Sequence, residues 1–205
     1  MIAIRELYSI TPINVMGKYS LRMLTFKDLD WYIHNCREPY YNKYLDFSFA
    51  KDVAQDKLQS IFYNLVVGYA IKATNVSEAR LVLVDNKSNE IIGGCTIFEK
   101  EHKKEYEIAY FIIPKMQCNG LGESLLLSLM SAMKFSILKF EHIDAIVMSS
   151  NTASIKLLEK TGFKKTCEYV GRRGINYVYR IHTDDIKQVS SKPNTKGKNK
   201  RNRTR

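Results

Sequence analysis

Residues 117–122 read Gln117-Cys118-Asn119-Gly120-Leu121-Gly122, and they separate two segments whose apolar residues follow different periods. From Tyr106 to Ile113 the chain alternates and is rich in β-branched and aromatic residues, which predicts a strand that Pro114 ends. From Leu121 to Ile137 an apolar residue returns at every fourth position, which predicts an amphipathic helix. A strand, a glycine turn and the start of a helix are therefore expected within a few residues.

The predicted junction has the properties of an anion-binding site. The first backbone N–H groups of a helix have no intrahelical partners, and they lie at the positive end of the helix dipole. Gly120 and Gly122 carry no side chains, so a phosphate can approach the backbone there. The glycine spacing fits neither Gly-x-Gly-x-x-Gly nor Gly-x-x-x-x-Gly-Lys-Ser/Thr, which argues against a Rossmann nucleotide site and a P-loop.

A second motif lies about thirty residues further on, after a short predicted strand from Ile143 to Met148. It reads Asn151-Thr152-Ala153-Ser154-Ile155-Lys156-Leu157-Leu158-Glu159-Lys160-Thr161-Gly162-Phe163. The first stretch resembles Gln/Arg-x-x-Gly-x-Gly/Ala, the acetyl-CoA signature of the GNAT N-acetyltransferases. The second resembles the Asn-x-x-Ser-x-x-Leu/Tyr-Leu/Tyr-Glu-Lys-x-Gly-Phe segment of the same superfamily. The chain is most similar to the RimJ/RimL-like branch, the ribosomal-protein-alanine N-acetyltransferases.

The remaining predicted elements follow the order found in that superfamily. Further strands are expected at 19–24, 80–85, 91–98, 163–170 and 175–182, and helices are expected after Thr25-x-x-Asp28 and at 52–65. The resemblance implies an α/β (α+β) fold, a single GNAT-like domain over residues 1–186. Its central sheet is expected to be mixed and mostly antiparallel, with helices on both faces and with the fourth and fifth strands splayed apart.

The resemblance also implies acetyl-CoA as co-substrate, with no metal. In the family, backbone N–H groups of the fourth strand hold the pantetheine arm and the thioester oxygen. Carried over, this role falls to Phe111, Ile112 and Ile113, with the Ile112 N–H as the oxyanion donor. The residues expected to hold the pyrophosphate are Gln117, Cys118, Asn119, Gly120, Leu121, Gly122 and Glu123. Asn151 is expected to bind the pantetheine amides, and Ser154 lies one turn along the same helix face, toward the cofactor.

Two residues are expected to be catalytic, Glu107 and Ser154. The run from Glu107 to Tyr110 reads Glu-Ile-Ala-Tyr and resembles the Glu-Ile-Gly-Tyr of the ribosomal-protein acetyltransferase branch, so Glu107 is the expected general base. Many GNAT enzymes protonate the leaving thiolate with a tyrosine of the second motif, and here that position holds Leu158. Ser154, Tyr110 or water can take over this role, and the sequence does not choose among them.

The acceptor amine is predicted from its acidity. An α-amine, with a pKa near 7.7–8.0, is about one tenth neutral at pH 7, whereas a lysine amine near 10.4 is far less so. A site with one carboxylate and no tyrosine acid therefore favours the N-terminal amine of a protein or peptide. An aminoglycoside or another small amine is an alternative acceptor. A non-catalytic acyl-CoA-binding protein with an RNA-binding tail is a further alternative.

The net charge of +11 is concentrated at one end of the chain. Residues 187–205 hold eight Lys and Arg residues, no acidic residue and almost nothing apolar, which predicts a disordered tail. Such a tail can contact RNA or the ribosome through counterion release, or it can act as a solubilising segment without a partner. The rest of the chain carries a charge of only about +3.

The remaining composition argues against several other classes. The four cysteines, Cys36, Cys95, Cys118 and Cys167, contain no Cys-x-x-Cys pair, which argues against a zinc site and a disulfide framework. The N-terminal sequence predicts neither a signal peptide nor a membrane span, so a cytoplasmic protein is expected. The protein is expected to be a monomer or a homodimer, and the closing hairpin is the expected contact of a dimer.

Overall fold

The computed structural model describes residues 3–38, 53–70, 78–100, 104–136 and 139–189, and its strands form one sheet in the order β1-β2-β3-β4-β5-β6-β8-β7. The strands are β1 (Ile13–Val15), β2 (Tyr19–Met23), β3 (Glu78–Asp85), β4 (Ile91–Glu99), β5 (Glu105–Ile112), β6 (His142–Met148), β7 (Lys164–Gly171) and β8 (Gly174–His182). The α-helices are α1 (Ala3–Ile10), α2 (Leu29–Arg37), α4 (Gln55–Ala70), α5 (Leu121–Lys134) and α6 (Thr152–Lys160). Among the described strand pairs, β5 and β6 run parallel and the others antiparallel, so the predicted mixed, mostly antiparallel sheet is confirmed.

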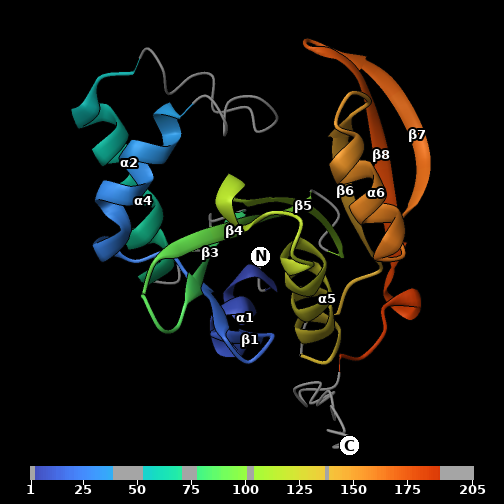
Figure 1. Ribbon diagram of the computed structural model, residues 1–205, viewed down its shortest axis with the longest axis horizontal. Coiled ribbons are helices and arrows are strands. Elements are labelled where there is room, and N and C mark those ends of the chain that lie inside the picture. The colour runs from blue at the N-terminus through green and yellow to red at the C-terminus, as the bar shows by residue number, and fades with distance from the viewer. Residues whose placement is uncertain (1–2, 39–52, 71–77, 101–103, 137–138, 190–205) are drawn as a thin grey trace, which may run out of the picture.

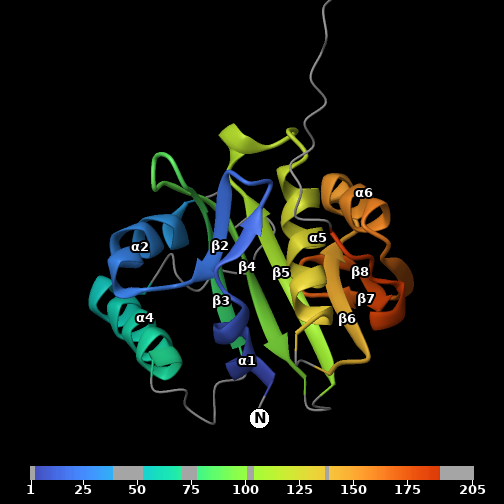
Figure 2. The same cartoon turned by 90° about the horizontal axis from the view of Figure 1, so that it is seen from below.

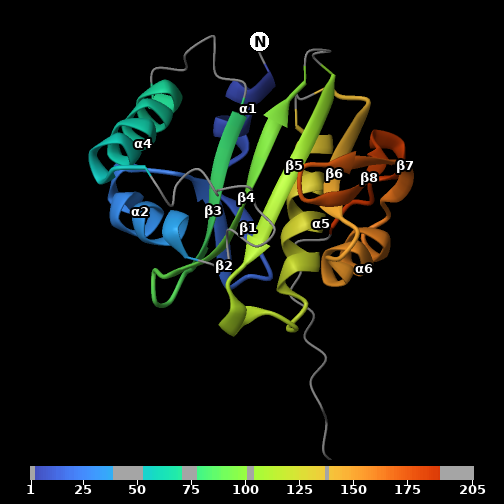
Figure 3. The same cartoon turned by 90° about the horizontal axis from the view of Figure 1, so that it is seen from above.

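Helices cover both faces of the sheet, as predicted. In Figure 1, α2 and α4 lie above and to the left of β3 and β4, while α1 and α5 lie below β3, β4 and β5, and α6 lies beside β6 and β8. Figures 2 and 3 show the same layers from the two sides of the molecule. The buried side chains of α5 recur at the predicted spacing, and they include Leu121, Leu125, Leu126, Leu129, Met130 and Met133. The apolar stripe of α5 therefore forms part of the core on the lower face.

The two faces of β5 meet different helices. The Phe111 ring stacks on Trp31 of α2, with ring centroids 6.1 Å apart. The hydroxyl of Tyr110, the preceding residue, lies 2.6 Å from the Ser154 hydroxyl of α6. Successive side chains of a strand point to opposite faces, so the odd-numbered residues of β5 face α2 and the even-numbered ones face α6.

Strands β5 and β6 stay together over only a short length. Their paired residues are Glu105 with His142, Tyr106 with Ile143 and Glu107 with Asp144. Beyond this point β5 continues to pair with β4, and β6 continues to pair with β8. The sheet therefore opens between β5 and β6, which confirms the predicted splay of the fourth and fifth strands, counted from the first predicted strand at residue 19.

Some elements differ from the sequence-based expectations. Helix α1 and strand β1 were not predicted, because eight and three residues are too few for a periodic pattern to stand out. The helix expected at 52–65 spans Gln55–Ala70 instead, since its apolar residues continue through Leu65 and Val66. Asp52 and Ile137, at the ends of two predicted helices, lie outside the described residues.

The predicted start of a helix at Thr25-x-x-Asp28 is built around a buried carboxylate. A 3₁₀ turn (Phe26–Asp28) leads directly into α2. The Asp28 carboxylate accepts hydrogen bonds from the Thr25 N–H at 2.7 Å and from the Thr25 hydroxyl at 3.0 Å. It also accepts two from the Arg22 guanidinium, at 2.8 and 2.9 Å. Burial raises the pKa of Asp28, but these bonds outweigh it and hold the pKa below its usual value.

The end of the described chain packs on α5. Ile186 is buried, and its carbonyl accepts a hydrogen bond of 2.8 Å from the Lys134 ammonium. The Val189 N–H donates to the Ser131 hydroxyl at 3.2 Å. Residues 190–205, which hold most of the predicted basic tail, lie outside the described residues, so the disorder and RNA contact of that tail stay predictions. Within the described ranges, no helix has the length and apolar character needed to cross a membrane.

Candidate active site

A cleft of about 500 Å³ opens where β5 and β6 separate. Its walls come from both strands, from the loop before α5 and from α6. The residues that line it are Ile108, Ala109, Tyr110, Phe111, Ile112, Met116, Gln117, Cys118, Gly120, Leu121, Gly122, Glu123, Ala145, Ile146, Val147, Met148, Asn151, Ala153, Ser154, Lys156, Leu157, Leu158 and Lys160. The fold thus brings most of the predicted cofactor-binding residues to one cleft. Ile113, Asn119 and Glu107 are not among the lining residues.

The loop before α5 has the geometry expected of an anion site. The first helical hydrogen bond runs from the Ser124 N–H to the Gly120 carbonyl, so the amides of residues 121–123 precede it at the helix start. Gly120 has a left-handed φ of +73° and no atom within 4 Å of where a Cβ would stand. Its missing side chain therefore leaves open space in front of the loop.

Gly122 lies close to the Leu157 side chain of α6, and the phosphate approach expected at this glycine stays a prediction. A Cβ at this position would lie 2.9 Å from the Cδ2 atom of Leu157. Contacts this short are too close for two carbon atoms, so Gly122 allows α5 and α6 to pack closely at the head of the cleft. Cys118 is exposed in the same loop with a positive φ of 62°, and its thiol is free.

The hydrogen-bond pattern between β4 and β5 sets the direction of the Ile112 N–H, which is the expected hydrogen-bond donor to the oxyanion. The Ile113 N–H bonds to the Ile92 carbonyl of β4 at 3.0 Å. Successive N–H groups of a strand point to opposite sides, so the Ile112 N–H points away from β4 and toward the gap between β5 and β6. The Gln117 side-chain amide donates to the Ile112 carbonyl at 2.8 Å. Gln117 therefore braces the end of β5 in this structure, whereas a pyrophosphate contact was expected of it.

Asn151 and Ser154 hold the start of α6 against β5. The Asn151 side-chain oxygen accepts a hydrogen bond of 3.2 Å from the Ser154 N–H, which makes Asn151 the N-cap of α6. The Ser154 hydroxyl forms a 2.6 Å hydrogen bond with the Tyr110 hydroxyl. Burial raises the pKa of Tyr110 to about 12, although the bond with Ser154 acts in the opposite direction. Two hydroxyl groups thus stand together in the cleft.

Leu158, at the position where many relatives carry tyrosine, is fully buried and lines the floor of the cleft. Among the lining residues, the hydroxyl groups of Tyr110 and Ser154 are the candidates to take the place of that tyrosine at the leaving thiolate. The sequence named both as candidates, but only the tertiary structure places Tyr110 of β5 against Ser154 of α6.

Glu107 lies where β5 and β6 part. It pairs with Asp144 at the last paired position, and as an odd-numbered residue of β5 it faces the side of α2. The cleft opens on the side of α5 and α6, so Glu107 would approach a bound thioester from the opposite face of the sheet. Burial raises the pKa of the Glu107 carboxyl, the Lys100 charge lowers it, and the Asp144 charge raises it, with a net rise.

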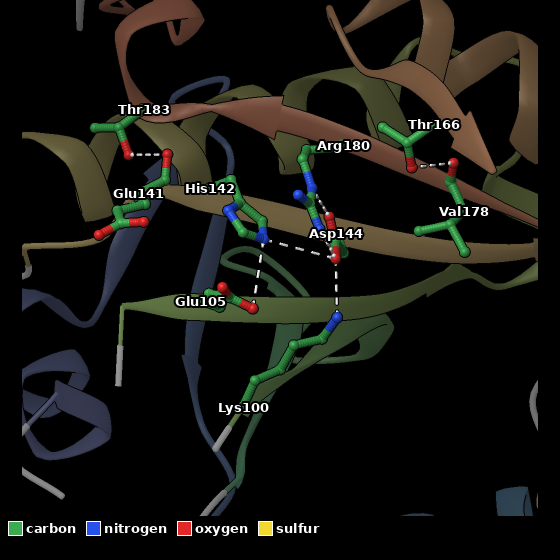
Figure 4. A network of polar contacts seen from close by, with 9 residues as sticks. All are labelled: Lys100, Glu105, Glu141, His142, Asp144, Thr166, Val178, Arg180 and Thr183. Carbon is green, nitrogen blue, oxygen red and sulfur yellow. Dashed lines mark hydrogen bonds and ion pairs between the residues drawn. The ribbon is translucent and has the colours of Figure 1, made fainter. Parts of the chain in front are cut away.

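A cluster of charged side chains surrounds this point (Figure 4). The Asp144 carboxylate accepts two hydrogen bonds from Arg180, at 2.7 and 2.9 Å, and one from Lys100 at 2.8 Å. The His142 Nε2 atom lies 3.7 Å from both the Glu105 and the Asp144 carboxylates. Burial and the Arg180 charge hold the pKa of His142 below its usual value, so its ring is neutral at pH 7.

A small apolar cavity of about 50 Å³ lies on the other side of β5, under α2. Trp31, Tyr32 and Phe111 form much of its wall, and Phe111 also lines the main cleft. Trp31 thus lies on the same face of β5 as Glu107. The aromatic residues that follow α2 in the sequence, Tyr40, Tyr41, Tyr44, Phe47 and Phe49, lie outside the described residues.

Sequence reasoning missed two cations of the cleft, Lys156 and Lys160. They are four residues apart on α6 and therefore share one helix face. Lys160 forms an ion pair of 2.6 Å with Glu123 in the first turn of α5, while Lys156 is exposed. Their spacing within the second motif was the available signal, but it does not show that this face of α6 turns toward the loop at 117–123.

The family described as Acetyltransferase (GNAT) domain matches residues 19–164. The chain therefore belongs to the GNAT acetyltransferase family, and it is an acetyl-CoA-dependent N-acetyltransferase. A comparison with curated proteins gave no match.

Solved structures with the same fold act on different acceptors. One is the spermidine N-acetyltransferase of Vibrio cholerae in complex with CoA and spermine (19% identity, TM-score 0.68, 83% of this chain and 98% of that chain). Another is RimL, a ribosomal L7/L12 α-N-protein acetyltransferase in complex with coenzyme A (13% identity, TM-score 0.71, 84% and 98%). A third is AAC(6')-Ib in complex with ribostamycin and coenzyme A (15% identity, TM-score 0.66, 82% and 95%). At such identities the likeness establishes the fold, and the acceptor has to be argued from this chain's own residues.

Proposed function

We propose that this protein transfers the acetyl group of acetyl-CoA to the N-terminal α-amine of a protein or peptide. The observation that carries the proposal is the charge balance at the point where β5 and β6 part. Among the described residues, the carboxylates of Glu105, Glu107 and Asp144 stand there with the cations Lys100 and Arg180. Spermine and aminoglycosides carry several positive charges and favour a strongly acidic groove, whereas an α-amine brings a single charge.

The acidity of the acceptor supports the same choice. At pH 7 about one tenth of an α-amine is already neutral, so a single carboxylate suffices to remove its proton as the bond to carbon forms. Burial raises the pKa of Glu107 toward that of the amine, which improves a carboxylate as a base. A lysine side chain would demand a stronger base than the site offers.

The reaction uses both faces of the gap. The amine nitrogen attacks the thioester carbon from the side of α2, and Glu107 takes the amine proton directly or through a water molecule. The carbonyl oxygen gains negative charge, which the Ile112 N–H stabilises. The carbon–sulfur bond then breaks, and the Tyr110 hydroxyl donates a hydrogen bond to the departing thiolate. With a pKa of about 12, Tyr110 stays protonated and is a better hydrogen-bond donor than a source of a free proton.

The cofactor is assigned to the cleft on the side of α5 and α6. The amides of residues 118–123 would hold the pyrophosphate at the positive end of α5, as phosphate groups are held at other helix starts. The exposed Lys156 would add a positive charge beside it. Asn151 keeps its side-chain NH₂ group for the pantetheine arm, because its oxygen caps α6.

Membership of the RimJ/RimL-like branch is part of the proposal. Support comes from the run Glu107–Tyr110 and from Leu158 in place of the usual tyrosine. RimL is among the structures of the same fold, together with a spermidine and an aminoglycoside acetyltransferase.

The test is release of CoA thiol from acetyl-CoA by the purified chain with a panel of acceptors at equal concentration. The panel holds peptides with a free N-terminus, the same peptides with a blocked N-terminus and an internal lysine, spermidine, and kanamycin. We expect thiol release with the free N-terminal peptides only, with the acetyl group located on the α-amine by mass spectrometry. A higher kcat/KM with spermidine or kanamycin, or with the blocked peptides, contradicts the proposed acceptor.

A further inference from the structure

The ion pairs of Asp144 connect β6, β8 and the loop after β4 at the point where the sheet opens. Asp144 belongs to β6 and is only 1% exposed. It accepts two hydrogen bonds from Arg180 of β8 and one from Lys100, which follows the last residue of β4 (Figure 4). No step of the proposed reaction involves Asp144 or its two partners, although Asp144 is paired with the proposed base, Glu107, across β5 and β6.

The strand register fixes the path of the Lys100 side chain. The Lys100 N–H bonds to the Glu105 carbonyl at 2.9 Å, so Lys100 stands opposite Glu105 across β5. Asp144, which Lys100 reaches, stands opposite Glu107 on the other side of β5. Because residues paired in this way point to the same face, the Lys100 side chain crosses β5 diagonally, between the side chains of Glu105 and Glu107. The Lys100 side chain therefore lies beside the carboxylates of Glu105 and Glu107, and its ammonium bonds to the third carboxylate, that of Asp144.

Glu107 has no hydrogen bond or ion pair among the contacts of the described residues, whereas Lys100 is bonded to Asp144. The buried Asp144 holds the ammonium because a carboxylate removed from water needs every opposite charge within reach. An ammonium bonded to Glu107 instead would occupy the lone pairs that the amine proton needs.

We propose that Asp144 is a positioning residue that holds the Lys100 ammonium away from Glu107, so that the Glu107 carboxylate stays unpaired in front of the acceptor amine. This inference rests on the proposed role of Glu107 as base. The other charged and titratable groups of the cluster are Glu105 of β5, His142 of β6, and Arg180 and His182 of β8. His142 is neutral, and Arg180 is committed to Asp144, so Lys100 is the cation that can change partner.

The direction of the electrostatic effects agrees with this arrangement. The Asp144 charge raises the pKa of Glu107 and the Lys100 charge lowers it. Removal of the Asp144 charge would take away the first effect and strengthen the second, since the ammonium would become free to approach Glu107. An opposite charge within about 4–6 Å lowers a carboxyl pKa by about one to three pH units.

The test is a titration of the Glu107 side-chain carboxyl by carbon-13 NMR in the full chain, with its signal assigned by its absence in Glu107→Gln. In Asp144→Asn we expect the Glu107 pKa to fall by about one to three pH units. In the double variant Asp144→Asn, Lys100→Met we expect it to return to the wild-type value or above. A Glu107 pKa that stays in place in Asp144→Asn, or that stays low in the double variant, overturns the proposal.

A second variant guards against misfolding, because Asp144→Asn leaves the Arg180 guanidinium without its partner. The pair Asp144→Asn, Arg180→Met removes both charges together, which costs less than an orphaned charge and still releases Lys100. The Glu107 pKa is expected to fall here too, and to recover when Lys100→Met is added. Lys115→Met is the matched control, since Lys115 forms an exposed ion pair with Glu90 at 3.2 Å, and it should leave the Glu107 pKa unchanged.

Kinetics separates this inference from the proposed function. If Glu107 is the base, the acid limb of the kcat/KM profile moves with the Glu107 pKa in each variant, and kcat recovers in the double variant. A Glu107 pKa that moves as expected while kcat/KM keeps its wild-type pH profile contradicts Glu107 as base but supports the placement of Lys100. If Asp144 does not hold Lys100 away, Asp144→Asn lowers the Glu107 pKa only through the loss of its own charge, by the same amount with Lys100 in place as with Lys100→Met.

Discussion

Asp28 and Asp144 are two buried aspartates, each held by two hydrogen bonds from one arginine, and they differ in where their partners come from. The partners of Asp28 are Thr25 and Arg22, three and six residues away along the chain. The partners of Asp144 are Arg180 and Lys100, which are 36 and 44 residues away. The first aspartate is bonded by its own neighbourhood in the sequence, and the second only by the assembled sheet.

This difference matters because it separates a turn that forms locally from a charge cluster that forms only with the assembled sheet. Asp28 fixes the entry into α2, and its bonds can form as soon as that turn forms. Asp144 becomes bonded only when β4, β5, β6 and β8 have assembled in the sheet, which is also when the cleft forms. A charge cluster that depends on the assembled sheet can act on the chemistry of the cleft, whereas a local turn cannot. Substitution of Asp28 should therefore change stability, whereas substitutions beside Asp144 should change catalysis.

The largest expected effect is on stability, at the local site. Asp28→Asn should lower the free energy of unfolding by about 3 kcal/mol at pH 7, because it leaves the Arg22 charge without its partner. The folded-state pKa of Asp28 lies below its usual value, so this stabilisation is present above about pH 4 and is lost as the pH falls through the folded-state pKa. Urea unfolding at pH 7 and pH 3 measures both points.

The matched control for this substitution is Asp185→Asn. Asp185 is exposed and lies 3.9 Å from Lys164, so its loss should cost less than about 1 kcal/mol. The folded fraction of Asp28→Asn should keep the wild-type kcat/KM. A pH profile of kcat/KM that changes in this variant would contradict the separation between the two aspartates.

The next effect is on catalysis, beside Asp144. Glu107→Gln should lower kcat by about 100-fold, since general-base catalysis contributes at least that much. Its stability should not fall, because burial raises the pKa of Glu107 and its ionisation therefore opposes folding at pH 7. Measurements of kcat from pH 5 to 9 and of thermal unfolding decide the point.

In the wild type, kcat/KM should fall as the pH drops through the raised pKa of Glu107, because the base must be deprotonated to act. Glu90→Gln is the control, since Glu90 is exposed and pairs only with Lys115 among the described contacts. A Glu107→Gln enzyme that keeps both its turnover and its pH profile would rule out the base.

A smaller effect is expected from the pair of hydroxyls inside the cleft. Tyr110→Phe should lower kcat by about tenfold, which corresponds to one lost hydrogen bond to the thiolate of about 1.4 kcal/mol. Because the pKa of Tyr110 is about 12, the pH profile should keep its shape and only move down. Tyr63→Phe, at an exposed site of α4, should leave kcat unchanged. A changed acid limb in Tyr110→Phe would mean that Tyr110 acts through Glu107.

The smallest effect is expected at Lys156, an exposed residue of the cleft that takes part in neither aspartate's contacts. Lys156→Gln should raise the Kd of CoA by about threefold at low salt, as an exposed charge contributes at most about 1 kcal/mol, and the difference should shrink at high salt. Calorimetry with CoA measures it. Lys164→Gln, on β7, is the control. An equal loss in both variants would mean that overall charge, and not Lys156, attracts the cofactor.

Much of the fold was predictable because its signals are local. The alternation of β5, the fourfold spacing of α5, and the Thr25-x-x-Asp28 start of α2 each depend on residues within one or two turns of each other. The start of α5 after the glycine loop at 117–122 was likewise predictable, and that this loop holds an anion stays a prediction. Short elements such as β1, with three residues, carry too little pattern to be found.

The charge cluster around Asp144 could not be predicted from the sequence, and the reason is physical. Nothing near Lys100 or Arg180 in the chain indicates that both meet Asp144, because their contact depends on the register of four strands. The same holds for Lys156, whose direction depends on how α6 packs against α5.

The sequence by itself determined the family, the helix start that can hold an anion, and the residues that can act as base and hydroxyl donors, since each of these is a property of residue type and short-range spacing. The tertiary structure alone decided that Glu107 and the cleft lie on opposite faces of one gap, that Tyr110 meets Ser154, and that Asp144 captures Lys100. These contacts join residues 36 to 44 positions apart, and only the pairing of β4, β5, β6 and β8 and the position of α6 beside β5 bring them within hydrogen-bond distance.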